Sequence, residues 1–132
     1  VGLGAGYWYG APVPTAVEIV SFTAEPWDEV ILIRWETAME VDLLGFNLYR
    51  ADTLDGVRLQ LNETLIPVQA PGSPIGAQYE WSDDNGLLEG QTYFYWLEAV
   101  DVHGVGELFG PVDAVAGVWR LYLPLVMKMN VP

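Results

Sequence analysis

The chain contains no cysteine, one lysine and one histidine among its 132 residues. Without cysteine it has no thiol nucleophile, no disulfide and no cysteine-bound metal. The histidine, His103, lies in a turn-like Asp-Val-His-Gly sequence, where a solvated side chain is expected rather than a general base. No apolar run approaches the roughly 20 residues of a membrane-spanning helix, so no membrane insertion is expected.

Positive charge is scarce, and its distribution is uneven. Eighteen acidic residues against five basic ones give a net charge of −13, which argues against binding nucleic acid or an anionic lipid surface. All 18 acids and three of the bases lie in residues 17–117, a segment charge of −15. In the segments 1–16 and 118–132, the only charged residues are Arg120 and Lys128. Since chain ends are usually solvated, these apolar segments are expected to be held against another surface, either of the same domain or of a neighbour.

Residues 17–117 predict an all-β fold. Alternating or β-branched segments are separated by turn residues at intervals of about 8–12 residues, with turns such as Pro26-Trp27-Asp28 and Asp84-Asn85-Gly86. The expected strands cover residues 17–24, 29–37, 45–52, 57–62, 77–82, 91–101 and 107–116. About seven strands at this spacing predict an antiparallel β-sandwich, with extended segments at 1–16 and 118–132.

This middle segment resembles the fibronectin type III-like modules of bacterial secreted and surface proteins. The resemblance covers residues 17–117 and is carried by Trp35, Phe46, Leu48 and the run Leu88-Glu89-Gly90-Gln91-Thr92-Tyr93. It implies that Tyr93 bonds back to the connection before its strand, while Tyr95 and Leu97 join Trp35 and Phe46 in the core. It also implies an extracellular or cell-surface location, but it specifies no function.

Two of the expected strands are apolar on both faces. In the strand 91–101, alternation sends Phe94 and Trp96 to the face opposite the core, and in 29–37 it does the same for Val30 and Leu32. A strand of this kind normally has both faces covered. The cover is either another part of the same chain or a neighbouring subunit, so Phe94 and Trp96 are candidate contacts.

The segment 118–132 has the most one-sided pattern in the chain. Its apolar row consists of Trp119, Leu121, Leu123, Leu125, Met127 and Met129. The alternate row is mixed and includes Arg120, Pro124 and Lys128, as in a strand that lies over a core. Burying six large side chains is worth on the order of 10 kcal/mol before ordering costs. The segment therefore either folds back on its own domain or adds a strand to a neighbouring subunit.

Three shorter motifs carry weaker predictions. The segment 1–16 is rich in glycine and clusters Tyr7, Trp8 and Tyr9, which makes it either a linker or a second contact. Asp83-Asp84-Asn85-Gly86 is expected to be a hairpin turn, although its acidity would also suit Ca²⁺. Asn62-Glu63-Thr64 fits the N-glycosylation sequence in a surface loop.

Together these features predict a structural subunit of an extracellular homopolymeric filament or surface assembly, linked through the C-terminal strand, because a head-to-tail contact propagates. The expected partner is a second copy of the chain. The alternative is an accessory spacer or carbohydrate-binding module of a secreted enzyme or adhesin, with Trp27, Trp81 or Trp96 exposed in a row. No enzyme activity and no cofactor or metal are expected, because no base, nucleophile and stabiliser occur together.

Overall fold

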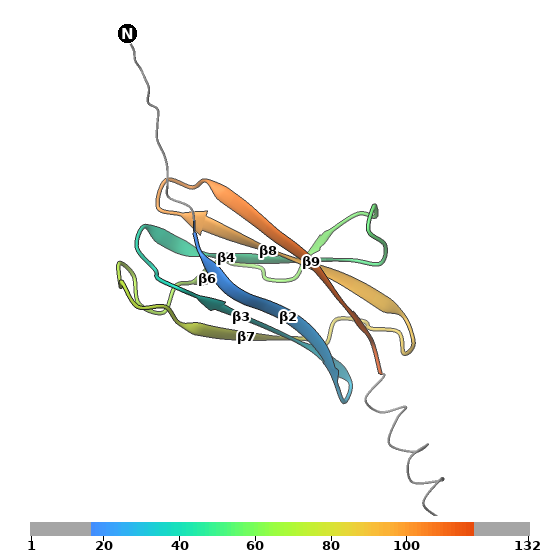
Figure 1. Ribbon diagram of the computed structural model, residues 1–132. Coiled ribbons are helices and arrows are strands. Elements are labelled where there is room, and N and C mark those ends of the chain that lie inside the picture. Colours follow the sequence, from blue (N-terminus) through green and yellow to red (C-terminus); the bar gives the residue numbers. More distant parts are fainter. Residues whose placement is uncertain (1–16, 118–132) are drawn as a thin grey trace, which may run out of the picture.

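Two antiparallel sheets packed face to face form a β-sandwich in the computed structural model, which describes residues 17–117 (Figure 1). The small sheet has the order β2–β3–β7, with β2 at Ile19–Trp27, β3 at Val30–Thr37 and β7 at Gln78–Asp83. The large sheet has the order β5–β4–β8–β9, and β6 also pairs with β4. Its strands are β4 Leu43–Ala51, β5 Leu59–Gln60, β6 Ile66–Pro67, β8 Thr92–Asp101 and β9 Gly106–Val115. The predicted all-β antiparallel sandwich is confirmed, and residues 17–117 contain no helix that could span a membrane.

The expected strands differ from the observed ones in three places. Pro26 and Trp27 belong to β2 rather than to a turn, and the chain reverses at Asp28 and Glu29, with Asp28 at a φ of 57°. Proline is tolerated there because β2 is an edge strand with one unpaired side. β6 was not expected from the sequence, and the strand expected over 57–62 is only two residues long.

The sandwich core is filled by residues of β3, β4, β7, β8 and β9. Trp35, Phe46, Tyr95 and Leu97 are at most 2% exposed, as is Tyr93. The Trp35 ring stacks on Tyr79 at a centroid distance of 5.2 Å and meets the edge of Phe46 at 5.5 Å. The backbone N–H of Leu88 donates to the Tyr93 hydroxyl at 2.8 Å, so the bond back to the preceding connection is present.

Each end of the sandwich contains a buried carboxylate bound to a tyrosine hydroxyl. Asp83 is 1% exposed and accepts from the Tyr95 hydroxyl at 2.6 Å. Glu40 is fully buried, accepts from the Tyr79 hydroxyl, and also accepts from the backbone N–H of Ala70 at 2.9 Å. The pKa of both tyrosines is raised above the ordinary value of 10. Burial is the main cause, and the hydrogen bond to the carboxylate is the second.

These two tyrosines make the protein sensitive to alkali. Above about pH 10 the unfolded chain loses the phenolic protons that the folded state retains, so stability falls as the pH rises. Each group contributes at most about 1.4 kcal/mol per pH unit to the fall. We expect the melting temperature to drop above pH 10, and Tyr95→Phe to make the drop shallower in thermal unfolding followed by circular dichroism. An identical pH dependence for Tyr95→Phe and wild type would contradict this assignment.

The described chain enters and leaves the sandwich at opposite ends (Figure 1). At the entry end, Glu18 O accepts from Ala38 N and Asp42 O accepts from Val102 N, which brings the start of β2 together with the loops 38–42 and 102–105. At the exit end, Ala116 O accepts from Gly90 N. Strands β2, β7 and β9 all run from the entry end to the exit end, as their antiparallel registers require.

Candidate functional site

Exposed apolar side chains are concentrated at the two ends of the sandwich. At the entry end, at least 44% of the surface of each of six side chains is exposed: Met39, Val41, Leu44, Ile75, Val102 and Val105. At the exit end the corresponding residues are Trp27, Leu54, Val57 and Leu88. Exposed large apolar side chains that gather on one part of a protein surface are typical of interaction sites. Both ends of the sandwich are therefore candidate contact surfaces.

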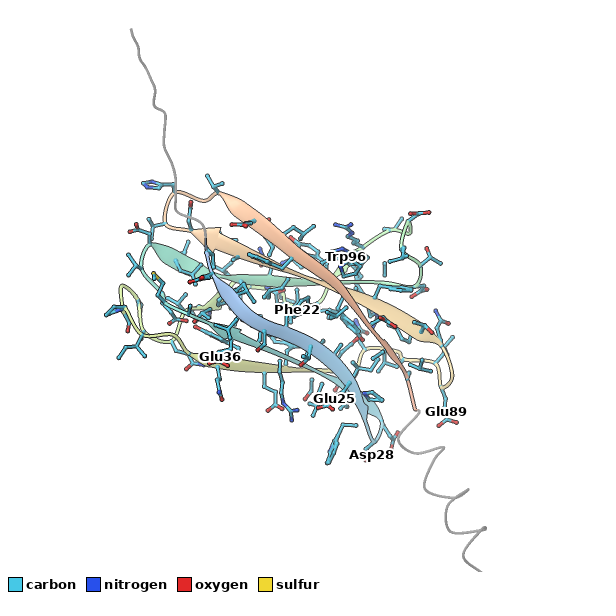
Figure 2. The ribbon with its side chains drawn as sticks, viewed as in Figure 1. Phe22, Glu25, Asp28, Glu36, Glu89 and Trp96 are labelled. Carbon is cyan, nitrogen blue, oxygen red and sulfur yellow. The ribbon has the colours of Figure 1, made fainter. Side chains whose placement is uncertain are left out.

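The outer face of the large sheet does not provide the open aromatic surface that the sequence suggested. Trp96 lies on that face, opposite the side that carries Glu25 and Glu36 (Figure 2), but is only 4% exposed. The guanidinium carbon of Arg58 lies 3.9 Å from its ring centre, a cation–π contact that covers the indole. Phe94 is half-buried. Of the two alternatives for the cover of Trp96, cover by the same chain is observed, because Arg58 in the connection between β4 and β5 lies over the ring.

A polar group adjoins Trp96 on this face. The Glu98 carboxylate accepts from the Tyr49 hydroxyl and from Asn47 Nδ2, both at 2.9 Å. Burial first, and then the bond to Glu98, raises the pKa of Tyr49. A shallow hollow of about 330 Å³ is lined by Tyr49, Arg58, Glu98, Gly106 and Leu108. In this hollow the Tyr49 hydroxyl bonds to the Glu98 carboxylate, and the Arg58 guanidinium lies over the Trp96 ring.

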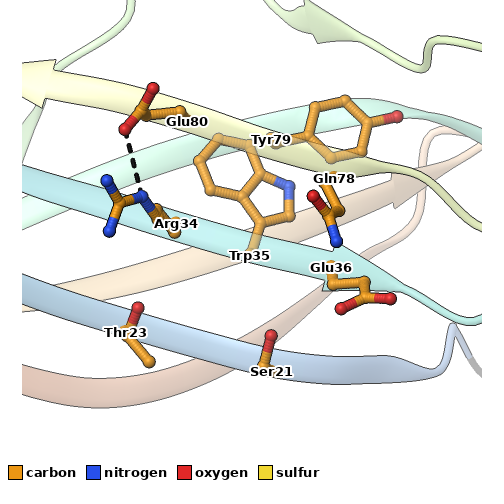
Figure 3. Close-up of a pocket in the computed structure, with 8 residues that line it drawn as sticks. All are labelled: Ser21, Thr23, Arg34, Trp35, Glu36, Gln78, Tyr79 and Glu80. Carbon is orange, nitrogen blue, oxygen red and sulfur yellow. Dashed lines mark hydrogen bonds and ion pairs between the residues drawn. The ribbon is translucent and has the colours of Figure 1, made fainter.

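The outer face of the small sheet is acidic. Arg34 Nη1 contacts Glu25 at 2.6 Å and Arg34 Nε contacts Glu80 at 3.0 Å, with all three side chains about half exposed. Glu36 lies on the same face of β3. A shallow pocket of about 440 Å³ on this face (Figure 3) is lined by Ser21, Thr23, Arg34, Trp35, Glu36, Gln78, Tyr79 and Glu80. One arginine among three glutamates leaves this face suited to a cationic partner.

The small sheet has an open edge along β7. Thr37 N donates to Ala77 O at 3.0 Å, and bonded pairs alternate along an antiparallel ladder. The β7 residues whose backbone groups face β3 are therefore Tyr79, Trp81 and Asp83, and those whose groups face away are Gln78, Glu80 and Ser82. Within residues 17–117, the backbone groups on this edge have one hydrogen-bond partner, the Gln69 side chain, which donates to the Gln78 carbonyl. The edge can accept another strand.

Asn62, the predicted glycosylation site, is a buried structural residue. It is 2% exposed, and its Oδ1 accepts from Leu48 N at 2.8 Å. Its Nδ2 donates to Thr64 O at 2.9 Å and to Asn47 Oδ1 at 2.8 Å. The expectation of an accessible surface asparagine is wrong. Beyond the end of β5, the Asn62 amide bonds to the β4 backbone in place of a strand partner.

The tryptophans named for sugar stacking do not form a row. Trp27 lies on the outer face of the small sheet and is 53% exposed, whereas Trp81 points between the sheets and Trp96 lies on the outer face of the other sheet. Asp83 is turned inward rather than exposed as a Ca²⁺ ligand, and residues 17–117 contain no group of acidic or histidine side chains placed to hold a metal. His103 is exposed in the turn after β8.

The predicted contacts in the terminal segments lie outside the described residues. They are Tyr7, Trp8, Tyr9, Trp119, Leu121, Leu123, Leu125, Met127 and Met129. The last described residue is Gly117, which has a φ of 76° and whose Cα faces the Glu89 side chain so closely that a Cβ would clash. Only glycine fits this exit position without strain.

Two solved structures have a similar sandwich. An Fn3-like protein from Clostridium thermocellum matches with a TM-score of 0.54 and 19% identity over 75% of this chain and 90% of that chain. Pectate lyase PelI from Erwinia chrysanthemi, solved in complex with tetragalacturonic acid, matches with a TM-score of 0.53 and 13% identity over 73% of this chain and 28% of that chain. Comparison with protein-family models and with curated proteins gave no match. The similarity confirms a fibronectin type III-like fold.

Proposed function

We propose that this chain is a structural subunit of an extracellular homopolymer, in which the sandwiches join end to end and the segment 118–132 adds a strand to the next subunit. The observation that carries the proposal is the concentration of exposed apolar side chains at the two ends where the chain enters and leaves. End-to-end contact would bury both surfaces, and a head-to-tail contact that does not close makes a filament.

Two further features support this proposal. The core of residues 17–117 is filled by residues of the sandwich itself, so the apolar row of 118–132 is not needed to complete it. The charge of −15 on residues 17–117 and of +2 on 118–132 gives modest attraction between subunits. This attraction is screened by salt.

The test is removal or alteration of the C-terminal segment. Deleting residues 118–132, or introducing Leu123→Asp with Leu125→Asp, is expected to leave a folded monomer, because charge cannot be buried in an apolar contact. The matched control is Tyr122→Ser with Val126→Ser, which alters the mixed row and should retain most of the assembly. Size-exclusion chromatography and negative-stain imaging give the assembly state, and circular dichroism confirms folding. Filaments formed by the deleted chain would overturn the proposal.

The second candidate function is a spacer module within a longer secreted enzyme. The match to 28% of the pectate lyase chain favours it, because there a similar sandwich forms part of an enzyme. A spacer module is expected to be a monomer as the wild-type chain. Under the same conditions the filament subunit is expected to give a ladder of polymers. The same chromatography therefore separates the two.

A further inference from the structure

Among the sheet edges of residues 17–117, β7 is the most receptive to an added strand. β2 and β9 contain Pro26 and Pro111 and lie side by side, so each partly covers the other (Figure 1). β5 and β6 are two residues long. β7 has six residues and no proline. Proline and mutual cover are the usual protections of an edge, and β7 lacks both.

The two faces beside the β7 edge differ in character. Toward the interior, Tyr79 is buried and Trp81 is half-buried at the edge of the core. Toward the outside, Glu80 and Glu36 form part of the acidic face. A strand added here meets apolar side chains on one face and carboxylates on the other.

The segment 118–129 matches this pair of faces. Its apolar row fits the interior side, where it would cover the exposed part of Trp81. Its mixed row then faces outward and carries Arg120 and Lys128 toward Glu80 and Glu36. Both the hydrophobic and the charge pattern are therefore satisfied by the same orientation.

Pro124 determines the direction of this strand. On the free edge of β7, the outward-bonding groups belong to residues whose side chains lie on the outer face, such as Glu80 and Ser82. An antiparallel partner bonds them through its own outer-face residues, whereas a parallel partner bonds them through its inner-face residues. Pro124 belongs to the mixed, outer-face row. In an antiparallel strand its missing N–H would leave a β7 carbonyl unpaired, and in a parallel strand it faces away from β7.

The direction also identifies the donor. β7 and β9 both run toward the exit end, so a segment that leaves at Gly117 and folds back along its own β7 runs antiparallel to it. The same segment from a subunit stacked against the entry end runs parallel to β7. We infer that residues 119–129 of one copy add as a parallel strand to the β7 edge of the next copy, with their apolar row toward the interior. This inference rests on the proposed function.

The first test removes the backbone donor at the edge. Glu80→Pro deletes an N–H that faces away from β3, so the sandwich is expected to fold while the polymer is lost. Glu80→Ala removes the same carboxylate but keeps the N–H, and is expected to retain polymers with altered salt dependence. Loss of polymer in both variants, or in neither, would overturn the assignment of this edge. Circular dichroism and a cooperative thermal transition verify that each variant folds.

The second test uses the absence of cysteine to read the strand direction. Full-length chains carry one cysteine on β7, as Gln78→Cys, Glu80→Cys or Ser82→Cys, and one on the mixed row, at Arg120, Tyr122, Val126 or Lys128. After oxidation, a disulfide-linked ladder on a non-reducing gel is expected. The tail cysteine that cross-links most efficiently is expected to have a higher residue number when the β7 cysteine is at Ser82 than when it is at Gln78. A reversed order, or a cross-link confined to the monomer, would indicate antiparallel fold-back and overturn the inference.

The two tests separate failure of this inference from failure of the proposed function. If wild type forms polymers that deletion of 118–132 abolishes, but no β7 pair cross-links, the segment connects subunits at another surface and the β7 inference is wrong. If wild type is monomeric throughout, both are wrong.

Discussion

Replacing Arg50 by methionine is expected to lower the free energy of unfolding by about 3–5 kcal/mol, because it leaves a buried carboxylate without its cation. Arg50 Nη1 lies 3.0 and 3.1 Å from the two carboxylate oxygens of Asp83 and donates to Asn85 O at 2.8 Å. The side chains of Arg50 and Asp83 are 11% and 1% exposed. Asp83 belongs to the small sheet and Arg50 to the large one, so the pair ties the two sheets together.

The measurement is guanidinium unfolding of Arg50→Met beside a matched control. Arg34→Met removes an arginine from two ion pairs on an exposed face, and its expected cost is below about 1 kcal/mol. A domain of this size has a total stability of about 5–15 kcal/mol, so the difference between the variants is large. Equal transition midpoints would show that the Arg50–Asp83 pair is not the main link between the sheets.

Asn62→Ala is expected to cost about 2–4 kcal/mol, since buried groups left without partners cost about 1–3 kcal/mol each. The substitution leaves Leu48 N–H and Thr64 O without the bonds that the amide makes. Thr64→Ala is the matched control, because it destroys the same glycosylation sequence but keeps the amide and exposes no buried group. Its expected effect is within about 0.5 kcal/mol.

Asn62 also gives a chemical test by mass spectrometry of the protein made in a host that glycosylates. Since the folded amide is buried and bonded, we expect the folded protein to carry no glycan at this position. Urea unfolding of Asn62→Ala and Thr64→Ala supplies the stability comparison. A glycan on Asn62 in the folded protein, or equal stability of the two variants, would contradict the structural role assigned to the amide.

If the β7 inference holds, the acidic face of the small sheet has a role in assembly. Arg34 lies between Glu25 and Glu80, and an incoming strand with Arg120 and Lys128 on its outer face would share these carboxylates. Assembly would then weaken with rising salt. The apolar row, which is insensitive to screening, would supply most of the binding energy.

The sequence by itself located every strand of residues 17–117 except β6, though not the exact bounds of each. Alternation is a local property with a period of two residues, so it places Tyr93, Tyr95 and Leu97 on one face of their strand and Phe94 and Trp96 on the other. Because both rows are apolar, it was the resemblance to fibronectin type III-like modules that assigned the first row to the core. The same locality explains the pattern of residues 118–132, whose apolar row is evident without any partner. A local pattern does not report where a strand ends when a distant residue decides it. β5 is shorter than expected because, beyond it, the Asn62 side chain bonds to β4.

Only the tertiary structure decided what covers or binds each side chain. Trp96 faces outward as alternation requires, yet Arg58 covers it. Asp83 is the first residue of a turn-like motif but points inward to Arg50. These partners are distant in sequence, so no local period reports them. The end positions of the exposed apolar residues and the free edge of β7 likewise arise only when separate strands are brought together, since an edge is defined by the strand that is absent beside it.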